Sequence, residues 1–182
     1  AGPGAARNAA LAMANGRWIL FLGDDIVASP GLLAAHARFL EASGAEKRMS
    51  LGHAEWDMGR VSKPFYEFAR AHHYDGLAPG QELDFRYFYT CNVALPKLAL
   101  ESAGGFDESF YVYAEDVSFG RSARLNGLRT VLREDVLVRH GSGSSGAPSL
   151  EMLRLRGASF AGYLTRYHRS KAWPMRGLMI VG

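Results

Sequence analysis

Short apolar segments alternate with longer amphipathic ones along this chain, and turn residues separate them. The unbroken apolar run at residues 18–22 predicts a strand buried on both faces, as in a parallel sheet. Before it, the Ala- and Leu-rich residues 5–15 predict a helix that stops at Gly16. After it, Ser29-Pro30 predicts the start of another helix, because a hydroxyl N-cap followed by proline favours a first turn.

The rest of the chain continues this alternation. Strands are predicted at residues 49–56, 86–95, 128–132 and 136–138, and helices at 64–72, 96–104, 115–126 and from 150 onward. Residues 74–84 contain two turn dipeptides and predict a long connection. Because helices and strands alternate, we expect an α/β domain over residues 1–148, with a mixed, partly parallel sheet flanked by helices.

Composition narrows the class of protein. The 182 residues fit one domain or two small ones, and 48% apolar residues indicate a folded core. A net charge of +3 is too weak to indicate a nucleic-acid partner. The single cysteine, Cys91, excludes an internal disulfide and a multi-cysteine zinc site, and it suits a reducing, cytoplasmic compartment. No apolar run reaches the roughly 18–20 residues of a membrane span.

Two acidic pairs carry the candidate chemistry. Asp24-Asp25 follows the predicted strand at residues 18–22, at the strand end where ligands bind in open α/β sheets, and offers oxygen ligands for Mg²⁺ or Mn²⁺. Glu115-Asp116 begins a predicted helix and could supply a general base. The alternatives are that the first pair only solvates a turn and that the second only complements the helix dipole.

One histidine, His140, also lies at the end of a predicted strand. His140 ends the strand-like run before a Ser/Gly-rich segment, so it is either a surface group or a third metal ligand near the first acidic pair. The other histidines, at positions 36, 53, 72, 73 and 168, have no such placement, and we expect them to be structural.

Taken in order, these motifs resemble the family 2 glycosyltransferases, which are inverting enzymes of the GT-A fold. The resemblance rests on Ala6-Arg7-Asn8, on residues 14–25, 91–95, 104–110, 115–120 and 124–127, and on His140. It covers about residues 1–145 and implies a GT-A-like (Rossmann-like) sheet that is incomplete at the N-terminus, because the family's first nucleotide-binding portion would precede Ala1. The family's acidic signature often begins with Asp where this chain has Gly23.

The resemblance also implies roles for individual residues. The implied metal ligands are Asp25 and His140, and the implied donor contacts are Arg7, Asp24 and Asp25. The implied catalytic groups are Asp116, as the base, and Glu115. The implied acceptor contacts are Asn92 and Glu115. The implied reaction is a metal-assisted, hexosyltransferase-type transfer with inversion. Its donor is a nucleotide-diphospho-sugar, and its acceptor is a glycan, a lipid or another hydroxyl compound. Such an enzyme would build a polysaccharide or another glycan.

Two other functions stay open. One is a non-catalytic carbohydrate- or partner-binding domain of the same fold. The other is a palm-type nucleotidyl transferase, whose acidic turn resembles residues 22–26. A palm needs a strand after that turn, whereas residues 29–31 predict a helix.

The C-terminal segment, residues 149–182, is expected to form a basic amphipathic helix and tail. Residues 151–182 contain six Arg or Lys residues against one Glu. Two interpretations are open. In one, the helix covers the domain core with a solvated basic face. In the other, it makes peripheral contact with an anionic membrane at the cytoplasmic face.

Overall fold

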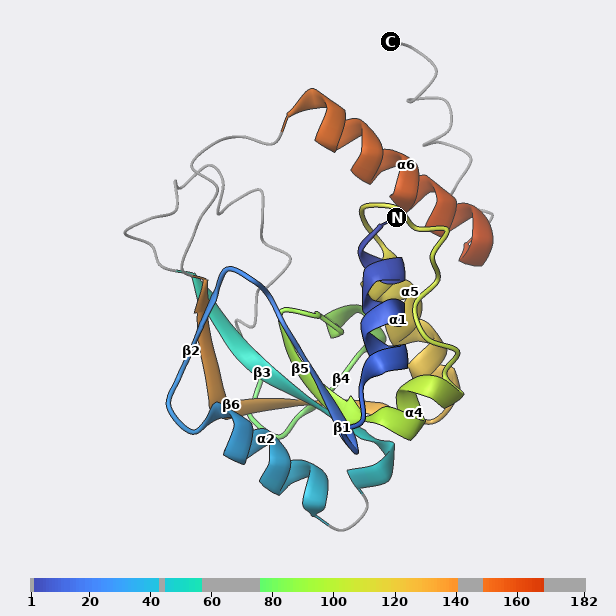
Figure 1. The fold of residues 1–182 in the computed structure, drawn as a ribbon. Helices are drawn as coiled ribbons and strands as arrows, with labels where there is room; N and C mark the ends of the chain where they lie inside the picture. Colours follow the sequence, from blue (N-terminus) through green and yellow to red (C-terminus); the bar gives the residue numbers. More distant parts are fainter. Residues whose placement is uncertain (1, 43–44, 57–75, 141–148, 169–182) are drawn as a thin grey trace.

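The computed structural model describes residues 2–42, 45–56, 76–140 and 149–168. Within this part of the chain, six strands form one mixed sheet in the order β1-β5-β3-β6-β2, and β4 pairs with β6 beside that path (Figure 1). The strands are β1 (Trp18–Leu22), β2 (Ile26–Ala28), β3 (Arg48–Trp56), β4 (Glu82–Leu83), β5 (Asn92–Pro96) and β6 (Arg129–His140). Strands β3 and β6 run parallel and the other pairs are antiparallel, which confirms the predicted partly parallel sheet.

Helices cover this sheet. Helix α2 (Leu32–Glu41) contacts β3, β5 and β6. Helices α1 (Pro3–Met13), α4 (Lys97–Ser102) and α5 (Glu115–Leu125) lie together, apart from α2 (Figure 1). The last helix, α6 (Leu150–Tyr167), lies across the segment that leads into α5. No helix in the described part of the chain combines the length and the hydrophobicity that crossing a bilayer requires.

The core lies between the sheet and the helices, and aromatic rings join α5 to it. The Phe119 ring of α5 lies 4.7 Å from Phe88 and 4.9 Å from Phe106, measured between ring centroids. Helix α5 also packs on a 3₁₀ turn at Phe85–Tyr87, where a Cβ on Gly120 would come within 2.4 Å of the Phe85 carbonyl oxygen. The middle of α5 therefore packs closely on this turn.

Strand β1 differs from its prediction. It pairs only with β5 among the described strands, in antiparallel register, and its side chains are half-buried with Leu22 exposed. The expectation of a fully buried parallel strand was therefore wrong for the described chain. A continuous apolar run fits an edge strand as well as a central one, because periodicity does not report the number of neighbours.

The segment after the acidic turn also differs. A short strand, β2, precedes the helix, which begins at Leu32 rather than at Ser29. Gly31 caps this helix with φ +82°, a left-handed conformation that glycine adopts without steric cost. Because β2 pairs with β6 and not with β1, the acidic turn does not close a hairpin of the palm type.

Other boundaries move for local reasons. Residues 85–87 form a 3₁₀ turn instead of a strand, because Asp84 accepts a hydrogen bond from the Arg86 N–H and caps it. The two strands predicted within residues 128–138 join into β6, with a register shift against β3 between Gly52 and Ala54. Helices α4, α5 and α6 confirm their predictions, and the helix predicted at residues 64–72 lies outside the described residues.

Candidate functional site

The second acidic pair lies at the first turn of α5, in an unusual backbone setting. Ala114, just before Glu115, has φ +77°, and it is the one non-glycine residue of the described chain with a positive φ. Such a conformation costs about 1–3 kcal/mol and persists only where packing enforces it. Ala114 is buried against Phe110, Tyr163 and Leu164, so the last two, from α6, help to impose the bend that aims the carboxylates.

Arg7 of α1 connects both carboxylates. Its Nη1 atom lies 2.8 Å from Glu115 Oε1 and 3.3 Å from Asp116 Oδ1. Asn8 fixes this end of α1, because its amide donates to the Phe106 carbonyl at 2.8 Å and accepts from the Phe106 N–H at 2.9 Å. The structure thus places Arg7 at the predicted base, and its expected contact with a donor nucleotide stays a prediction.

Asp116 is held from the other side by Thr90. Its Oδ2 atom accepts hydrogen bonds from the Thr90 hydroxyl at 2.9 Å and from the Thr90 N–H at 3.2 Å. Burial, followed by the negative charge of Glu115, raises the pKa of Asp116 to about 6, while Arg7 and Thr90 act in the opposite direction. The side chain keeps 23% of its exposure, so this carboxylate can exchange a proton near neutral pH.

The first acidic pair lies on the turn between β1 and β2. Gly23 donates its N–H to the Cys91 carbonyl at 3.2 Å, which ties the turn to the segment that precedes β5. A Cβ on Gly23 would lie 2.9 Å from Asp25 Oδ1, so a larger residue would displace that carboxylate. Glycine at position 23 thus leaves room for the Asp25 carboxylate in this conformation.

Cys91 lies between the two acidic segments: its carbonyl accepts from Gly23, and its neighbour Thr90 hydrogen-bonds Asp116. Burial, followed by the negative charges of Asp116 and Asp25, raises the pKa of this thiol to about 12. Both carboxylates therefore lie within electrostatic reach of one side chain, although they are distant in sequence. The sequence predicted this proximity only through its resemblance to a family.

His140 ends β6, and its backbone lies beside the acidic turn. It pairs with Ile26, the residue after Asp25, and with Trp56 on the other side. In the described part of the chain, no group of three or more His, Cys, Asp or Glu side chains is arranged to hold a metal. Asp25 and His140 stay the predicted metal ligands.

Asn92, the implied acceptor contact, lies inside the sheet. It is fully buried in β5, where its Nδ2 donates to the Val136 carbonyl at 2.8 Å and its Oδ1 lies 3.0 Å from His36 Nε2. His36 in turn lies 2.8 Å from Ser50 Oγ. This internal network occupies the amide of Asn92 and both ring nitrogens of His36. The acceptor contact implied for Asn92 stays a prediction.

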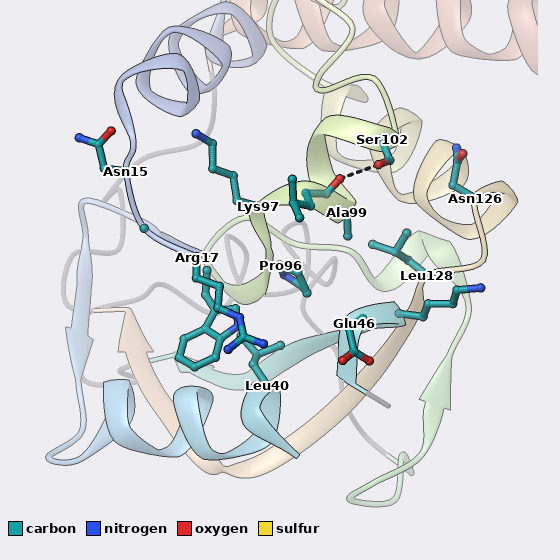
Figure 2. Close-up of a pocket in the computed structure, with 14 residues that line it drawn as sticks. Asn15, Arg17, Leu40, Glu46, Pro96, Lys97, Ala99, Ser102, Asn126 and Leu128 are labelled. Atoms are coloured by element: carbon teal, nitrogen blue, oxygen red, sulfur yellow. Dashed lines mark hydrogen bonds between the residues drawn. The ribbon is translucent and has the colours of Figure 1, made fainter. Parts of the chain in front are cut away.

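One cavity lies at the opposite end of β1 from the acidic turn. It has a volume of about 570 Å³ and is lined by Arg17 and Trp18 at the start of β1 and by Lys97 at the start of α4 (Figure 2). The acidic turn follows the other end of β1. None of the predicted site residues lines this cavity, and the Lys97 ammonium already donates to the Ala14 carbonyl at 2.7 Å.

Sequence reasoning missed Thr90 and Ala114. Thr90 lies in a segment that reads as strand, and no local pattern indicates that its hydroxyl reaches a residue 26 positions away. Ala114 carries no signal at all, because alanine rarely adopts a left-handed conformation. An unusual backbone angle becomes visible only in the structure.

Comparison with known proteins supports the family resemblance over the first part of the chain. Residues 1–83 match the family model described as glycosyl transferase family 2, which confirms the resemblance drawn from the motifs. The sequence has no significant match among curated proteins.

Solved structures with similar folds are glycosyltransferases of the GT-A fold, which confirms the predicted fold class. S. aureus TarS is 17% identical, with a TM-score of 0.56 over 93% of this chain and 53% of that chain. Its complex with UDP-GlcNAc is 24% identical, with a TM-score of 0.54 over 87% of this chain and 46% of that chain. GalNAc-T7 with UDP, GalNAc and Mn²⁺ is 10% identical, with a TM-score of 0.55 over 85% of this chain and 34% of that chain. The chain thus spans about half the length of the TarS structures or less.

Proposed function

We propose that the protein carrying this chain transfers a sugar from a nucleoside diphosphate sugar to an acceptor hydroxyl, with inversion at the anomeric carbon. The observation that carries the proposal is that the Thr90-Cys91 segment contacts both acidic segments: Thr90 donates two hydrogen bonds to Asp116, and the Cys91 carbonyl accepts one from Gly23, which precedes Asp24 and Asp25. The family match supports the reaction class. The donor class is supported by fold neighbours that bind UDP and UDP-GlcNAc.

Asp116 is the proposed general base. An attacking hydroxyl has a high pKa and must lose its proton as it attacks, so a carboxylate ionised near neutral pH serves the reaction. The Thr90 hydrogen bonds fix the orientation of this carboxylate, and the charge of Glu115 keeps it basic. Glu115, which is buried and paired with Arg7, is proposed to orient the site and to contact the acceptor.

The donor side of the site is proposed to lie at the acidic turn. Asp25 and His140 would hold Mg²⁺ or Mn²⁺, and a carboxylate oxygen with an imidazole nitrogen is a suitable donor set for Mn²⁺. When bound, such an ion neutralises the charge that develops on a leaving diphosphate. Asp24 and Arg7 are proposed to contact the nucleotide. With the base and the leaving group on opposite sides of the anomeric carbon, a single displacement inverts the configuration.

Substitution of the two key carboxylates in the full-length protein tests this assignment. A general base contributes about 10²–10⁴-fold, so Asp116→Asn should lower transfer from UDP-GlcNAc by that factor while donor binding, measured by calorimetry, stays nearly intact. Asp25→Ala should instead remove the Mn²⁺-dependent part of donor binding. Asp135→Asn, at an exposed carboxylate paired with Arg133, is the control. Comparable losses of donor binding in both acidic variants would argue against the assignment of the base.

A further inference from the structure

A buried polar network joins α2 to three strands of the sheet. His36 Nδ1 of α2 lies 2.8 Å from Ser50 Oγ of β3, and His36 Nε2 lies 3.0 Å from Asn92 Oδ1 of β5. Asn92 Nδ2 donates to the Val136 carbonyl of β6 at 2.8 Å. His36, Ser50 and Asn92 are almost completely buried, so these polar contacts are shielded from bulk water. We refer to these three residues as the His36 network.

The hydrogen bonds of the His36 network have one consistent arrangement. Because Asn92 donates its amide N–H to a carbonyl, its oxygen faces the imidazole and accepts from His36 Nε2. His36 Nδ1 then accepts from the Ser50 hydroxyl. The ring is neutral in this arrangement, in agreement with the burial that lowers the pKa of His36. The bond between His36 and Asn92 is therefore the one that links the helix to β5.

The sheet leaves room for the Asn92 amide at a register shift. Strand β3 shifts its pairing with β6 between Gly52 and Ala54. A Cβ on Gly52 would lie 2.0 Å from Asn92 Nδ2 and 2.4 Å from the Val136 carbonyl oxygen, so only glycine leaves this bond intact. An apolar core needs no such arrangement, and apolar groups of the same shape can replace a buried polar pair at little cost in stability. Stability alone therefore does not account for the His36 network.

The network anchors the strand end that leads into the candidate site. Asn92 is the first residue of β5 and directly follows the Thr90-Cys91 segment. That segment donates two hydrogen bonds to Asp116 and accepts one from Gly23. Asn92 also pairs with Leu22, the last residue of β1 before the acidic turn. The Asn92 side chain thus holds in place the backbone that reaches both acidic segments.

We propose that His36 is a positioning residue, which holds the Asn92 amide and thereby sets the place of the Thr90-Cys91 segment and of the Asp116 carboxylate. This inference rests on the proposed function, in which Asp116 is the base. The Thr90 N–H donates to Asp116 at 3.2 Å, the long end of the normal range, so a small displacement of the segment would break this bond. Helix α2 lies apart from α1 and α5 (Figure 1), and the network gives it an indirect hold on the base.

Two substitutions of His36 in the full-length protein test this inference. The amide nitrogen of Gln can replace Nε2, so His36→Gln keeps a donor for Asn92, whereas the shorter side chain of His36→Asn can reach only Ser50. In His36→Asn, the Thr90 hydrogen bonds should weaken, and the pKa of Asp116, measured from its carboxyl ¹³C resonance, should rise by about one unit. The kcat for transfer from UDP-GlcNAc should fall about tenfold, with the KM for the donor nearly unchanged.

The matched controls should retain both values. His36→Gln keeps the bond to Asn92, and Ser50→Ala removes only the other partner of the ring. If His36→Asn does not fold, Asn92→Leu removes the same hydrogen bond at nearly the same volume, and the same rise in the pKa of Asp116 is expected. A merely structural role would lower the free energy of unfolding in these variants and leave the titration of Asp116 in the folded protein unchanged.

The outcomes separate this inference from the proposed function, because the titration of Asp116 requires no transfer. A rise in the pKa of Asp116 in His36→Asn but not in His36→Gln would support the positioning role. An unchanged pKa in His36→Asn, or an equal rise in His36→Gln, would overturn that role even if Asp116→Asn abolishes transfer. Full transfer by Asp116→Asn would instead overturn the proposed base, whatever the titration shows.

Discussion

Replacing Arg7 and replacing Glu115 should shift the ionisation of Asp116 in opposite directions. Arg7→Met removes the positive charge that lies 3.3 Å from Asp116 Oδ1, so the pKa of Asp116 should rise. Glu115→Gln removes a neighbouring negative charge and keeps the shape of the side chain, so the pKa of Asp116 should fall. The opposite signs make the pair of variants informative, because a general loss of structure would not produce them.

The size of the Arg7 effect follows from Coulomb's law. Two unit charges separated by 3.3 Å interact by about 1 kcal/mol in water and by about 5 kcal/mol at an effective dielectric constant of 20. Because Arg7 and Asp116 keep 25% and 23% of their exposure, solvent screens the pair and the lower part of this range applies. One pKa unit corresponds to about 1.4 kcal/mol, so we expect a rise of about 1–2 units.

The pH dependence of transfer reports this shift. The base must be ionised, so activity is lost as the pH falls through the pKa of Asp116, which is about 6 in the unsubstituted protein. In Arg7→Met, the midpoint of this acidic limb should move to about pH 7–8, and at pH 7 about half or less of the protein would hold an ionised base. In Glu115→Gln, the midpoint should move below pH 6.

The assay is the profile of kcat/KM between pH 5 and 9, measured with saturating Mn²⁺. The ¹³C resonance of the Asp116 carboxyl carbon in the free protein gives an independent titration that does not depend on donor binding. Acidic limbs that coincide in all three proteins, or that shift in the same direction in both variants, would refute the assignment of Asp116 as the titrating base.

Four further predictions concern other parts of the fold. Burial lowers the pKa of His36, so His36 takes up a proton more readily in the unfolded chain than in the folded one. The midpoint of urea unfolding should therefore fall as the pH drops below about 6.5, and a midpoint that stays constant from pH 8 to pH 5.5 would contradict this. Gly52→Ala should destabilise the fold by about 2–3 kcal/mol, because its Cβ would lie 2.0 Å from a buried amide nitrogen. Gly162→Ala in α6, whose Cβ would meet only the Phe110 ring at an ordinary 3.8 Å, should instead stabilise the helix by about 0.5–1 kcal/mol in the same denaturation assay. If α6 contacts membranes, replacing the exposed Leu150 and Arg154 with Gln should reduce flotation with anionic liposomes. Equal flotation of the two proteins would contradict membrane contact by α6.

Local sequence signals predicted the helices well and the sheet only in outline. Helices α4 and α5 end where Gly104 and Gly127 adopt positive φ. Because glycine is the usual residue at such a helix end, its position in the sequence predicts where each helix stops. The sheet order and the edge position of β1 depend on which distant strands pair, and a short apolar run carries no such information. Asn92 shows the same limit, because a polar residue in a strand could face a ligand or, as here, an internal histidine.

The candidate site depends on residues on both sides of the predicted boundary at position 148. Tyr163 and Leu164 of α6 pack on Ala114, and the Tyr167 hydroxyl lies 3.1 Å from Ser118 Oγ in the first turns of α5. Arg121 lies over the Tyr167 ring at 4.5 Å, and Arg166 pairs with Asp107. The left-handed backbone at Ala114 costs free energy that this packing offsets, and that backbone directs Glu115 and Asp116. A helix that could be assigned from sequence to a separate basic tail thus supports the proposed base, so loosening α6 should impair transfer before it unfolds the sheet.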